Sequence, residues 1–161
     1  MSRATRLANH IERTVTGPMW HGPALTDVLD GVDAVRARAR PIPGAHSIWE
    51  IVLHVTAWAD IARRRIHGEG TGDPTPDRDW PPIADDWPRA LQQLTESHRR
   101  LAADVRQLDD AALDAKITGL TYPVGILLDG VVEHGTYHGG QIALLKKAGG
   151  PGDAPTTGTM I

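Results

Sequence analysis

The sequence predicts an all-α protein of one domain, built around four long helices packed as a bundle. Three observations support this prediction. Apolar residues recur every three to four positions over long segments, helix-capping residues precede several of these segments, and stretches rich in glycine and proline separate them. The chain has 161 residues and is 40% hydrophobic, which is enough for one well-buried domain and too short for two.

The N-terminal part is expected to contain one long and one short helix. The long helix covers about Arg3 to Thr16. The short helix starts at Pro23, whose fixed φ suits the first helical position, and runs to about Gly31. Two prolines and a glycine in residues 41–44 then predict a rigid connector.

The second long helix is predicted from Ser47 to His67. Ser47 and Glu50 have the spacing of a capping box, in which Glu50 reaches back from the third helical position. His54 lies at the edge of the apolar stripe, one turn before Trp58. The stripe itself consists of Ile48, Ile51, Val52, Val55, Ala59, Ala62 and Ile66.

Residues 68–87 hold prolines, glycines and aspartates with little periodicity, so they are expected to form a long loop. At roughly 3.3 Å per residue, this loop could cross the ~30 Å length of a bundle. The helices on either side therefore need not be antiparallel neighbours. The third long helix follows, from about Asp86 to Leu108, with its apolar stripe at Leu91, Leu94, Leu101, Val105 and Leu108.

A short helical turn is expected at residues 109–113, and the fourth long helix begins near Pro123 and ends at Gly149. Residues 1–150 are predicted to form the single domain, and residues 151–161 a poorly ordered C-terminal tail. The fourth helix contains five glycines, each of which costs about 1 kcal/mol relative to alanine. Close helix packing would explain them, and space for a bound metal is the alternative.

Composition and charge exclude several kinds of function. Because the chain has no cysteine, any thiol chemistry needs a thiol that arrives with the substrate. The polar start of the chain and the lack of a long apolar run predict a cytoplasmic protein without a membrane span. The net charge of −3 argues against nucleic-acid binding. Arginines at 36–40 and 63–65 precede loop signals, which favours cations at helix C-termini over an anion site.

Two histidines four residues apart, His134 and His138, lie in the fourth predicted helix. His138 falls on the apolar stripe, seven residues from both Val131 and Leu145, and His134 sits one turn before it. Side chains at i and i+4 meet above the same patch of a helix, so two imidazoles there can share a divalent metal. Such pairs also arise on ordinary helices.

His54 offers a third imidazole from another helix. A bundle could bring it against the pair, giving three nitrogen donors with no fourth protein ligand evident, which suits an open metal site. The alternative is that His54 is a core-edge residue while His134 and His138 hydrogen-bond across a helix seam. Spacing alone leaves both interpretations open.

The chain resembles the DinB superfamily, which includes the YfiT-like proteins described as metal-dependent enzymes. The resemblance rests on residues 49–54, Trp-Glu-Ile-Val-Leu-His, and on residues 134–142, His-Gly-Thr-Tyr-His-Gly-Gly-Gln-Ile. Further similarities are residues 20–23, Trp-His-Gly-Pro, residues 79–81, Asp-Trp-Pro, and Trp87. The family pattern implies metal ligands at His54, His134 and His138, and a four-helix bundle with a long crossover loop and short extra helices.

The resemblance also implies a range of chemistry. Relatives include thiol-dependent S-transferases, a mycothiol-dependent isomerase and proteins described as metal-dependent hydrolases, and they often form dimers. On this basis we expect a metal-dependent enzyme of the thiol S-transferase type that acts on a small molecule, with a low-molecular-weight thiol as a partner and a homodimer as its assembly. The alternatives are a metal-dependent hydrolase and a stress-response module that binds metal without turnover. Zinc or nickel is the expected metal, because imidazole donors suit borderline cations.

Four residues are candidates for the surroundings of the metal. His21 and Trp58 are candidate pocket residues, with an exposed loop histidine and a core tryptophan as the alternatives. Arg65, near the same helix face as His54, could reach an acidic substrate. Gln141 is either a partner of His138 or a polar residue at a helix seam.

Overall fold

The computed structural model describes residues 1–70, 72–84 and 86–149, and these residues form eight helices and no strand. The predicted all-α class is therefore confirmed. The expected C-terminal tail lies outside the described residues. The helices are α1 (Arg3–Thr16), α2 (Leu25–Leu29), α3 (Ala34–Arg38), α4 (Ile48–Ile66), α5 (Pro76–Asp79), α6 (Trp87–Val105), α7 (Asp110–Asp114) and α8 (Val124–Ala148). None of the described helices is long and apolar enough to cross a membrane.

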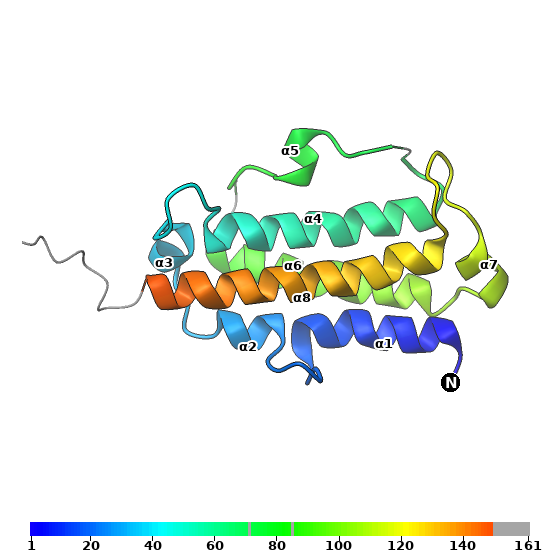
Figure 1. The fold of residues 1–161 in the computed structure, drawn as a ribbon, viewed down its shortest axis with the longest axis horizontal. Helices are drawn as coiled ribbons and strands as arrows, with labels where there is room; N and C mark the ends of the chain where they lie inside the picture. Colours follow the sequence, from blue (N-terminus) through cyan, green and yellow to red (C-terminus); the bar gives the residue numbers. More distant parts are fainter. Residues whose placement is uncertain (71, 85, 150–161) are drawn as a thin grey trace, which may run out of the picture.

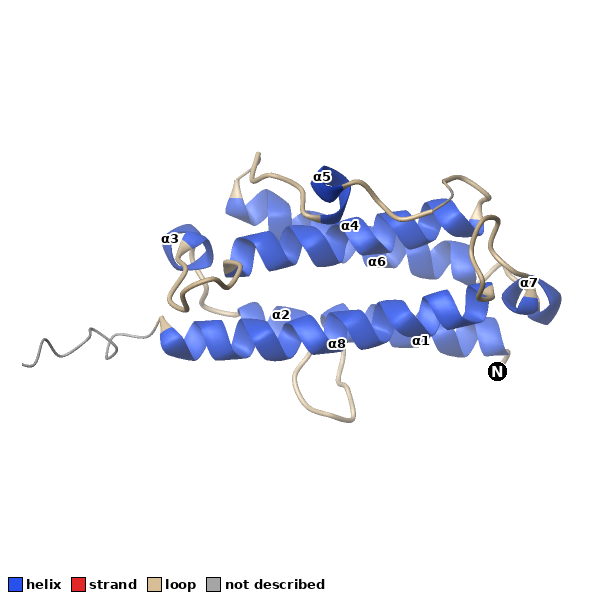
Figure 2. Cartoon of the chain, turned by 45° about the horizontal axis from the view of Figure 1, so that its top comes forward, coloured by secondary structure: helices blue, strands red, loops and turns tan. Residues whose placement is uncertain are grey.

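The four long helices lie side by side (Figure 1). Helices α1 and α4 each pack against both α6 and α8, so the four enclose a common interior. In a second view, α4 and α6 form one layer and α1 and α8 the other (Figure 2). The amphipathic stripes in the sequence face this interior, because only there can each helix bury its apolar side.

Helix starts follow the capping residues of the sequence. Ser47 Oγ accepts from the Glu50 amide at 3.2 Å, and the Glu50 carboxylate accepts from the Ser47 amide at 2.8 Å, which completes the predicted capping box. Asp86 caps α6 through a 2.8 Å bond from the Arg89 amide. The arginines at 63–65 occupy the last turn of α4, as the charge pattern predicts.

Three details of the short helices differ from the prediction. Helix α2 begins at Leu25, not at Pro23, because the Ala24 amide donates to the Asp27 carboxylate at 3.0 Å and makes Ala24 the N-cap. Helix α3 lies in a segment for which no helix bounds were predicted, although Arg36 and Arg38 occupy its last turn, as the charge pattern favoured. Helix α5 lies within the segment expected to be a loop. Both have four or five residues, too few to show a helical period in sequence.

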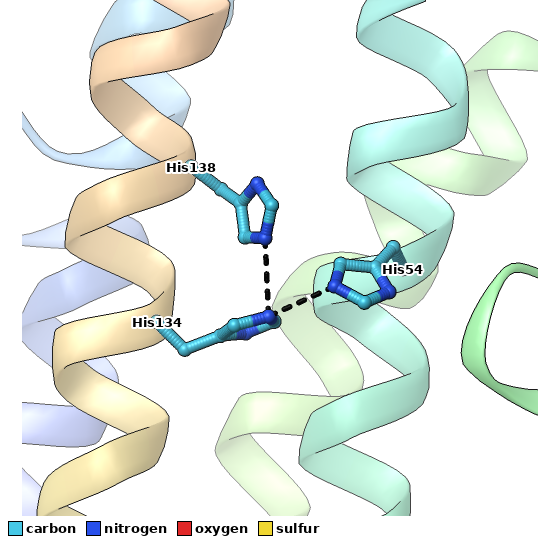
Figure 3. A group of neighbouring side chains, drawn as sticks. All are labelled: His54, His134 and His138. Carbon is cyan, nitrogen blue, oxygen red and sulfur yellow. Dashed lines mark hydrogen bonds between the residues drawn. The ribbon is translucent and has the colours of Figure 1, made fainter. Parts of the chain in front are cut away.

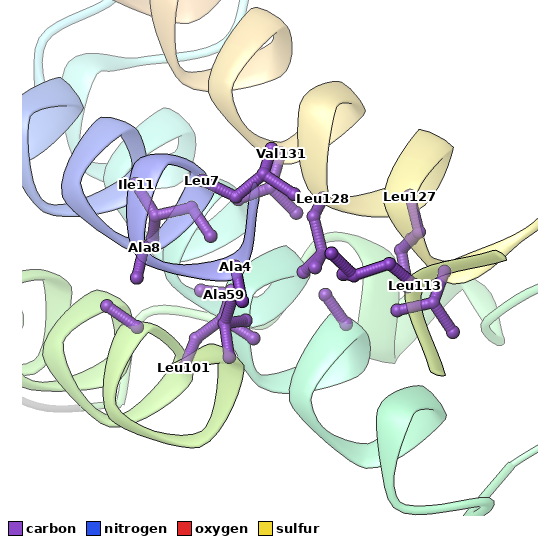
Figure 4. Packing of buried hydrophobic residues seen from close by; sticks show 14 of the residues in the cluster. Ala4, Leu7, Ala8, Ile11, Ala59, Leu101, Leu113, Leu127, Leu128 and Val131 are labelled. Atoms are coloured by element: carbon purple, nitrogen blue, oxygen red, sulfur yellow. The ribbon is translucent and has the colours of Figure 1, made fainter. Parts of the chain in front are cut away.

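Buried apolar side chains form two clusters along the helices. The first joins Ile11 of α1, Leu101 of α6 and Leu128 of α8 (Figure 4). The second contains Trp49 and Ile142. On α8, the first cluster ends at Val131 and the second starts at Ile142, so His134 and His138 fall between the two.

The segment between α4 and α6 runs back along α4 and carries α5 (Figure 1). Helix α5 packs against α4. This arrangement brings Asp79 and Trp80 close to His54, although 25 or more residues separate them in sequence.

Candidate metal centre

Three imidazoles converge between α4 and α8 (Figure 3). The Nε2 atom of His134 lies 2.9 Å from Nε2 of His54 and 3.1 Å from Nε2 of His138. One nitrogen from each ring lies within 4.8 Å of the other two, so the three residues could hold a metal ion. His54 and His138 are buried, and His134 is half-buried.

Helix geometry explains the convergence. His134 and His138 are one turn apart on α8, so their side chains project over the same patch of its surface. Helix α4 packs against α8 and presents His54 to that patch. Each histidine therefore sits on regular helix, which fixes its backbone more firmly than a loop would.

Proton counting shows why these imidazoles suit a cation. The main-chain oxygen of Asp79 lies 2.6 Å from His54 Nδ1 and can only accept, so Nδ1 carries the proton and Nε2 a lone pair. The Gln141 side-chain oxygen, 2.6 Å from His138 Nδ1, fixes His138 in the same way. The single Nε2 of His134 can donate to only one of these two lone pairs. A divalent cation would satisfy all three nitrogens.

The environment keeps all three imidazoles neutral at pH 7. Burial, followed by the neighbouring imidazoles of His138 and His54, lowers the pKa of His134 to about 3. Burial is also the main cause of the lowered pKa values of His54 and His138, against the hydrogen bonds that these rings make to Asp79 and Gln141, which raise the pKa values. Neutral imidazole is the form that binds metal, so these ligands need lose no proton first.

The His54 ring is packed among aromatic rings from three parts of the chain: Trp80 from the α4–α6 segment, Trp58 from α4 and, behind Trp80, His46 from the residues before α4. The Trp80 indole stacks on His54 with centroids 3.9 Å apart and an interplanar angle of 6°. His46 stacks on Trp80, with centroids 3.6 Å apart. Trp58 lies edge-on to His54, and its indole N–H donates to the Asp79 carboxylate at 2.7 Å. These contacts hold the His54 ring from several directions.

Two cavities meet the histidines along the α4–α8 groove. The first, of about 500 Å³, is lined by His54 and His138 together with Ile42, Ala45, His46, Ile51, Trp80, Tyr137, Gln141, Leu144 and Leu145. The second, of about 380 Å³, is lined by His54 and His134 together with Trp58, Asp79, Tyr122, Ile126, Leu127, Gly130 and Val131. Their volumes fall in the range of small-molecule sites.

A family model described as DinB superfamily matches residues 19–142, which include all three histidines. The chain belongs to the DinB superfamily. Comparison with curated proteins and with solved structures gave no match.

Two of the four residues that were predicted to surround a metal in this DinB chain contact the histidines. Gln141 accepts from His138 Nδ1 and donates to the Tyr137 hydroxyl at 3.0 Å. The Trp58 ring lies 5.7 Å from that of His134.

The other two candidates, Arg65 and His21, do not contact the three histidines. The Arg65 guanidinium bonds the Gly72 carbonyl at 2.7 Å and the Tyr122 hydroxyl at 3.3 Å, and lines a separate cavity of about 320 Å³. His21 is exposed and lines a cavity of about 200 Å³ beside Gly135 and Gly139. Neither residue lines the two cavities at the histidines.

Three residues at the site were not predicted to act there. Asp79 and Trp80 stand out in the sequence only as part of an Asp-Trp-Pro landmark, and nothing in the helix patterns places them against His54. His46 lies in no sequence pattern that would mark it as a site residue. Their positions depend on the course of the α4–α6 segment, which periodicity does not describe.

Close packing explains some of the glycines of α8 and not others. A Cβ at Gly135 would lie 2.6 Å from Thr14 Cγ2, and one at Gly139 would lie 3.4 Å from Leu25, so these glycines permit close packing with α1 and α2. Gly130 and Gly140 face open space, with nothing within 4 Å of an added Cβ. Close packing therefore does not explain the last two.

Proposed function

We propose that this DinB chain is a metal-dependent enzyme of the thiol S-transferase type that acts on a small molecule. The observation that supports the proposal most strongly is the convergence of three neutral imidazole nitrogens, from His54, His134 and His138, at the meeting point of two cavities. Zinc or nickel is the proposed metal, since imidazole donors suit both.

The donor count favours chemistry over a purely structural role. Structural zinc sites use four protein ligands, whereas catalytic sites use three and leave a position for water or substrate. The group found among the described residues has three members. When bound, a divalent ion would lower the pKa of a thiol or water that joins it.

The chain's own residues have distinct roles in this proposal. His54, His134 and His138 would hold the ion, while the Asp79 carbonyl and the Gln141 amide orient two of these rings. Trp80, stacked on the His54 ring, and Trp58, edge-on to it, would hold that ring in place. The chain contains no cysteine, so the reacting sulfur belongs to the substrate.

Two alternatives use the same residues. A metal-dependent hydrolase would activate water in place of a thiol. A non-catalytic stress-response module would bind the metal without turnover. The three possibilities differ in what occupies the open coordination position and in whether it reacts.

Cobalt substitution tests the transferase proposal directly. Cobalt-loaded protein is titrated with glutathione, coenzyme A, mycothiol and bacillithiol, and a sulfur-to-cobalt charge-transfer band in the near ultraviolet is expected with at least one of them. Because the chain has no cysteine, such a band can come only from the added thiol. If cobalt is bound and none of the thiols gives the band, the transferase proposal is wrong.

We also propose that the four long helices form a bundle of DinB/YfiT type, with residues 67–86 as its crossover connection and residues 1–150 as one domain. The exposed side chains of Tyr137 and Leu144 on α8 support a proposed homodimer, which sedimentation equilibrium can test. The cytoplasmic location expected from the sequence also stays a proposal.

A further inference from the structure

Gly130 occupies a helix interior position without a packing reason for glycine. It lies within α8, where glycine is less favourable than alanine because it loses more backbone freedom on folding. A Cβ there would meet nothing within 4 Å, in contrast to Gly135, where it would meet Thr14 at 2.6 Å. The open space above Gly130 belongs to the cavity of about 380 Å³ that also reaches His134.

The walls of this cavity are mostly apolar. Ile126, Leu127 and Val131 come from α8, and they face the rings of Trp58 and Tyr122. Ile126 is 56% exposed, which leaves one edge of the cavity accessible from solvent. Contact with such walls favours apolar ligand surface by about 25 cal/mol per Å² buried.

The charges at the cavity argue against an anionic occupant. Asp79 is the one formally charged residue among the lining residues, which include no lysine or arginine. The Arg65 guanidinium lies behind the wall, 5.5 Å from the Trp58 ring centroid, where it donates to the Gly72 carbonyl and the Tyr122 hydroxyl and lines a different cavity. A carboxylate or phosphate in this cavity would face the Asp79 carboxylate with no cationic side chain among the residues that line the cavity.

We propose that this cavity binds the uncharged, apolar part of the substrate, and that Gly130 sets the size of the group it accepts. The proposal rests on the proposed function, because His134 joins the cavity to the metal centre. It adds that the group next to the reacting atom is a small aromatic or branched aliphatic one. Any negative charge on the substrate then lies at the metal or outside this cavity.

The test uses a pair of glycines on the same helix. Gly130→Leu places a side chain in the cavity, whereas Gly140→Leu places one in open space beside a different cavity that His134 does not line. Binding of 4-fluorotoluene, a neutral apolar probe, is followed by fluorine NMR on the full chain. Circular dichroism checks that each variant is folded, and Gly130→Ala serves as a milder variant.

We expect Gly130→Leu to weaken binding of 4-fluorotoluene by about tenfold or more, because a leucine side chain occupies the apolar volume that the ring needs. Gly130→Ala should have a smaller effect, and Gly140→Leu none. On chelator-treated protein, where the carboxylate has no metal to bind, 4-fluorobenzoate should bind at least tenfold more weakly than 4-fluorotoluene.

Unchanged binding in Gly130→Leu would overturn the proposal, as would equal losses in the two leucine variants or equal affinity for the neutral and anionic probes. None of these readouts requires a bound metal. Failure of the metal centre is measured separately by metal content, so the two failures are distinguishable.

Discussion

Gln141 should control metal affinity through the orientation of a single imidazole. Its side-chain oxygen accepts from His138 Nδ1 at 2.6 Å, which directs the His138 Nε2 lone pair toward His134. Gln141→Leu removes this acceptor while keeping a side chain of similar size. The His138 ring can then turn, or carry its proton on Nε2, and either change removes a donor from the site.

General magnitudes and the burial of Gln141 together set the expected loss of zinc affinity. A hydrogen bond of this type contributes about 0.5–1.5 kcal/mol, and loss of the partner of a metal-binding histidine typically lowers affinity by roughly 10- to 100-fold. Gln141 is half-buried, so water can replace part of the lost contact. We therefore expect a decrease near the lower limit, about tenfold, in the affinity for zinc.

Competition with a chromophoric chelator measures this affinity, and two variants provide the comparison. Tyr137→Phe removes only the hydroxyl that accepts from the Gln141 amide at 3.0 Å, and should change affinity little. Asp79→Ala removes a carboxylate oxygen 3.3 Å from His54 Nδ1 but keeps the closer main-chain oxygen, 2.6 Å away, that accepts from this atom, and should therefore cost less than Gln141→Leu. Wild-type affinity in Gln141→Leu, or a larger loss in Asp79→Ala, would refute the reasoning.

Three further predictions concern stability. Burial lowers the pKa of His98 to about 4, so protonation favours the unfolded chain, and His98 should contribute about 3 kcal/mol to the fall in the free energy of unfolding as pH drops from about 6.5 to 4. Urea denaturation of His98→Leu should therefore show a fall that is smaller by about this amount than in the wild type, and an equal fall in the two proteins would contradict this contribution. Trp49→Ala should destabilise by about 3–5 kcal/mol because Trp49 is buried, and Trp58→Ala by less because it is half-buried; equal losses in urea denaturation would contradict this difference. Gly140→Ala should raise the melting temperature through the roughly 1 kcal/mol gained in helix propensity, whereas Gly135→Ala should not, because its Cβ would overlap Thr14; a rise of equal size in Gly135→Ala would count against that overlap.

The sequence predicts the long helices closely because their signals are local. Ser47 and Glu50 define the start of α4, and Pro123 and Gly149 bound α8. The His134 and His138 pair is equally local, since four residues on one helix fix their relation.

The features that were missed depend on contacts between distant segments. Trp80 reaches His54 only because the α4–α6 segment folds back along α4. The start of α2 was predicted at Pro23, but Ala24 is the N-cap because its amide donates to the Asp27 carboxylate. Arg65 shares a helix with His54, yet a carbonyl at Gly72 draws its guanidinium to another cavity.

The central claim is that His54, His134 and His138 bind one divalent ion, and metal analysis of protein purified without a histidine tag tests it most directly. We expect about one zinc or nickel ion per chain in the wild type and none in the His54→Ala, His138→Ala double variant, because a single remaining imidazole cannot form the site. The His67→Ala variant is the control, since His67 caps the far end of α4 and pairs with Asp104. It should keep its metal. A double variant that retains stoichiometric metal would contradict the assignment.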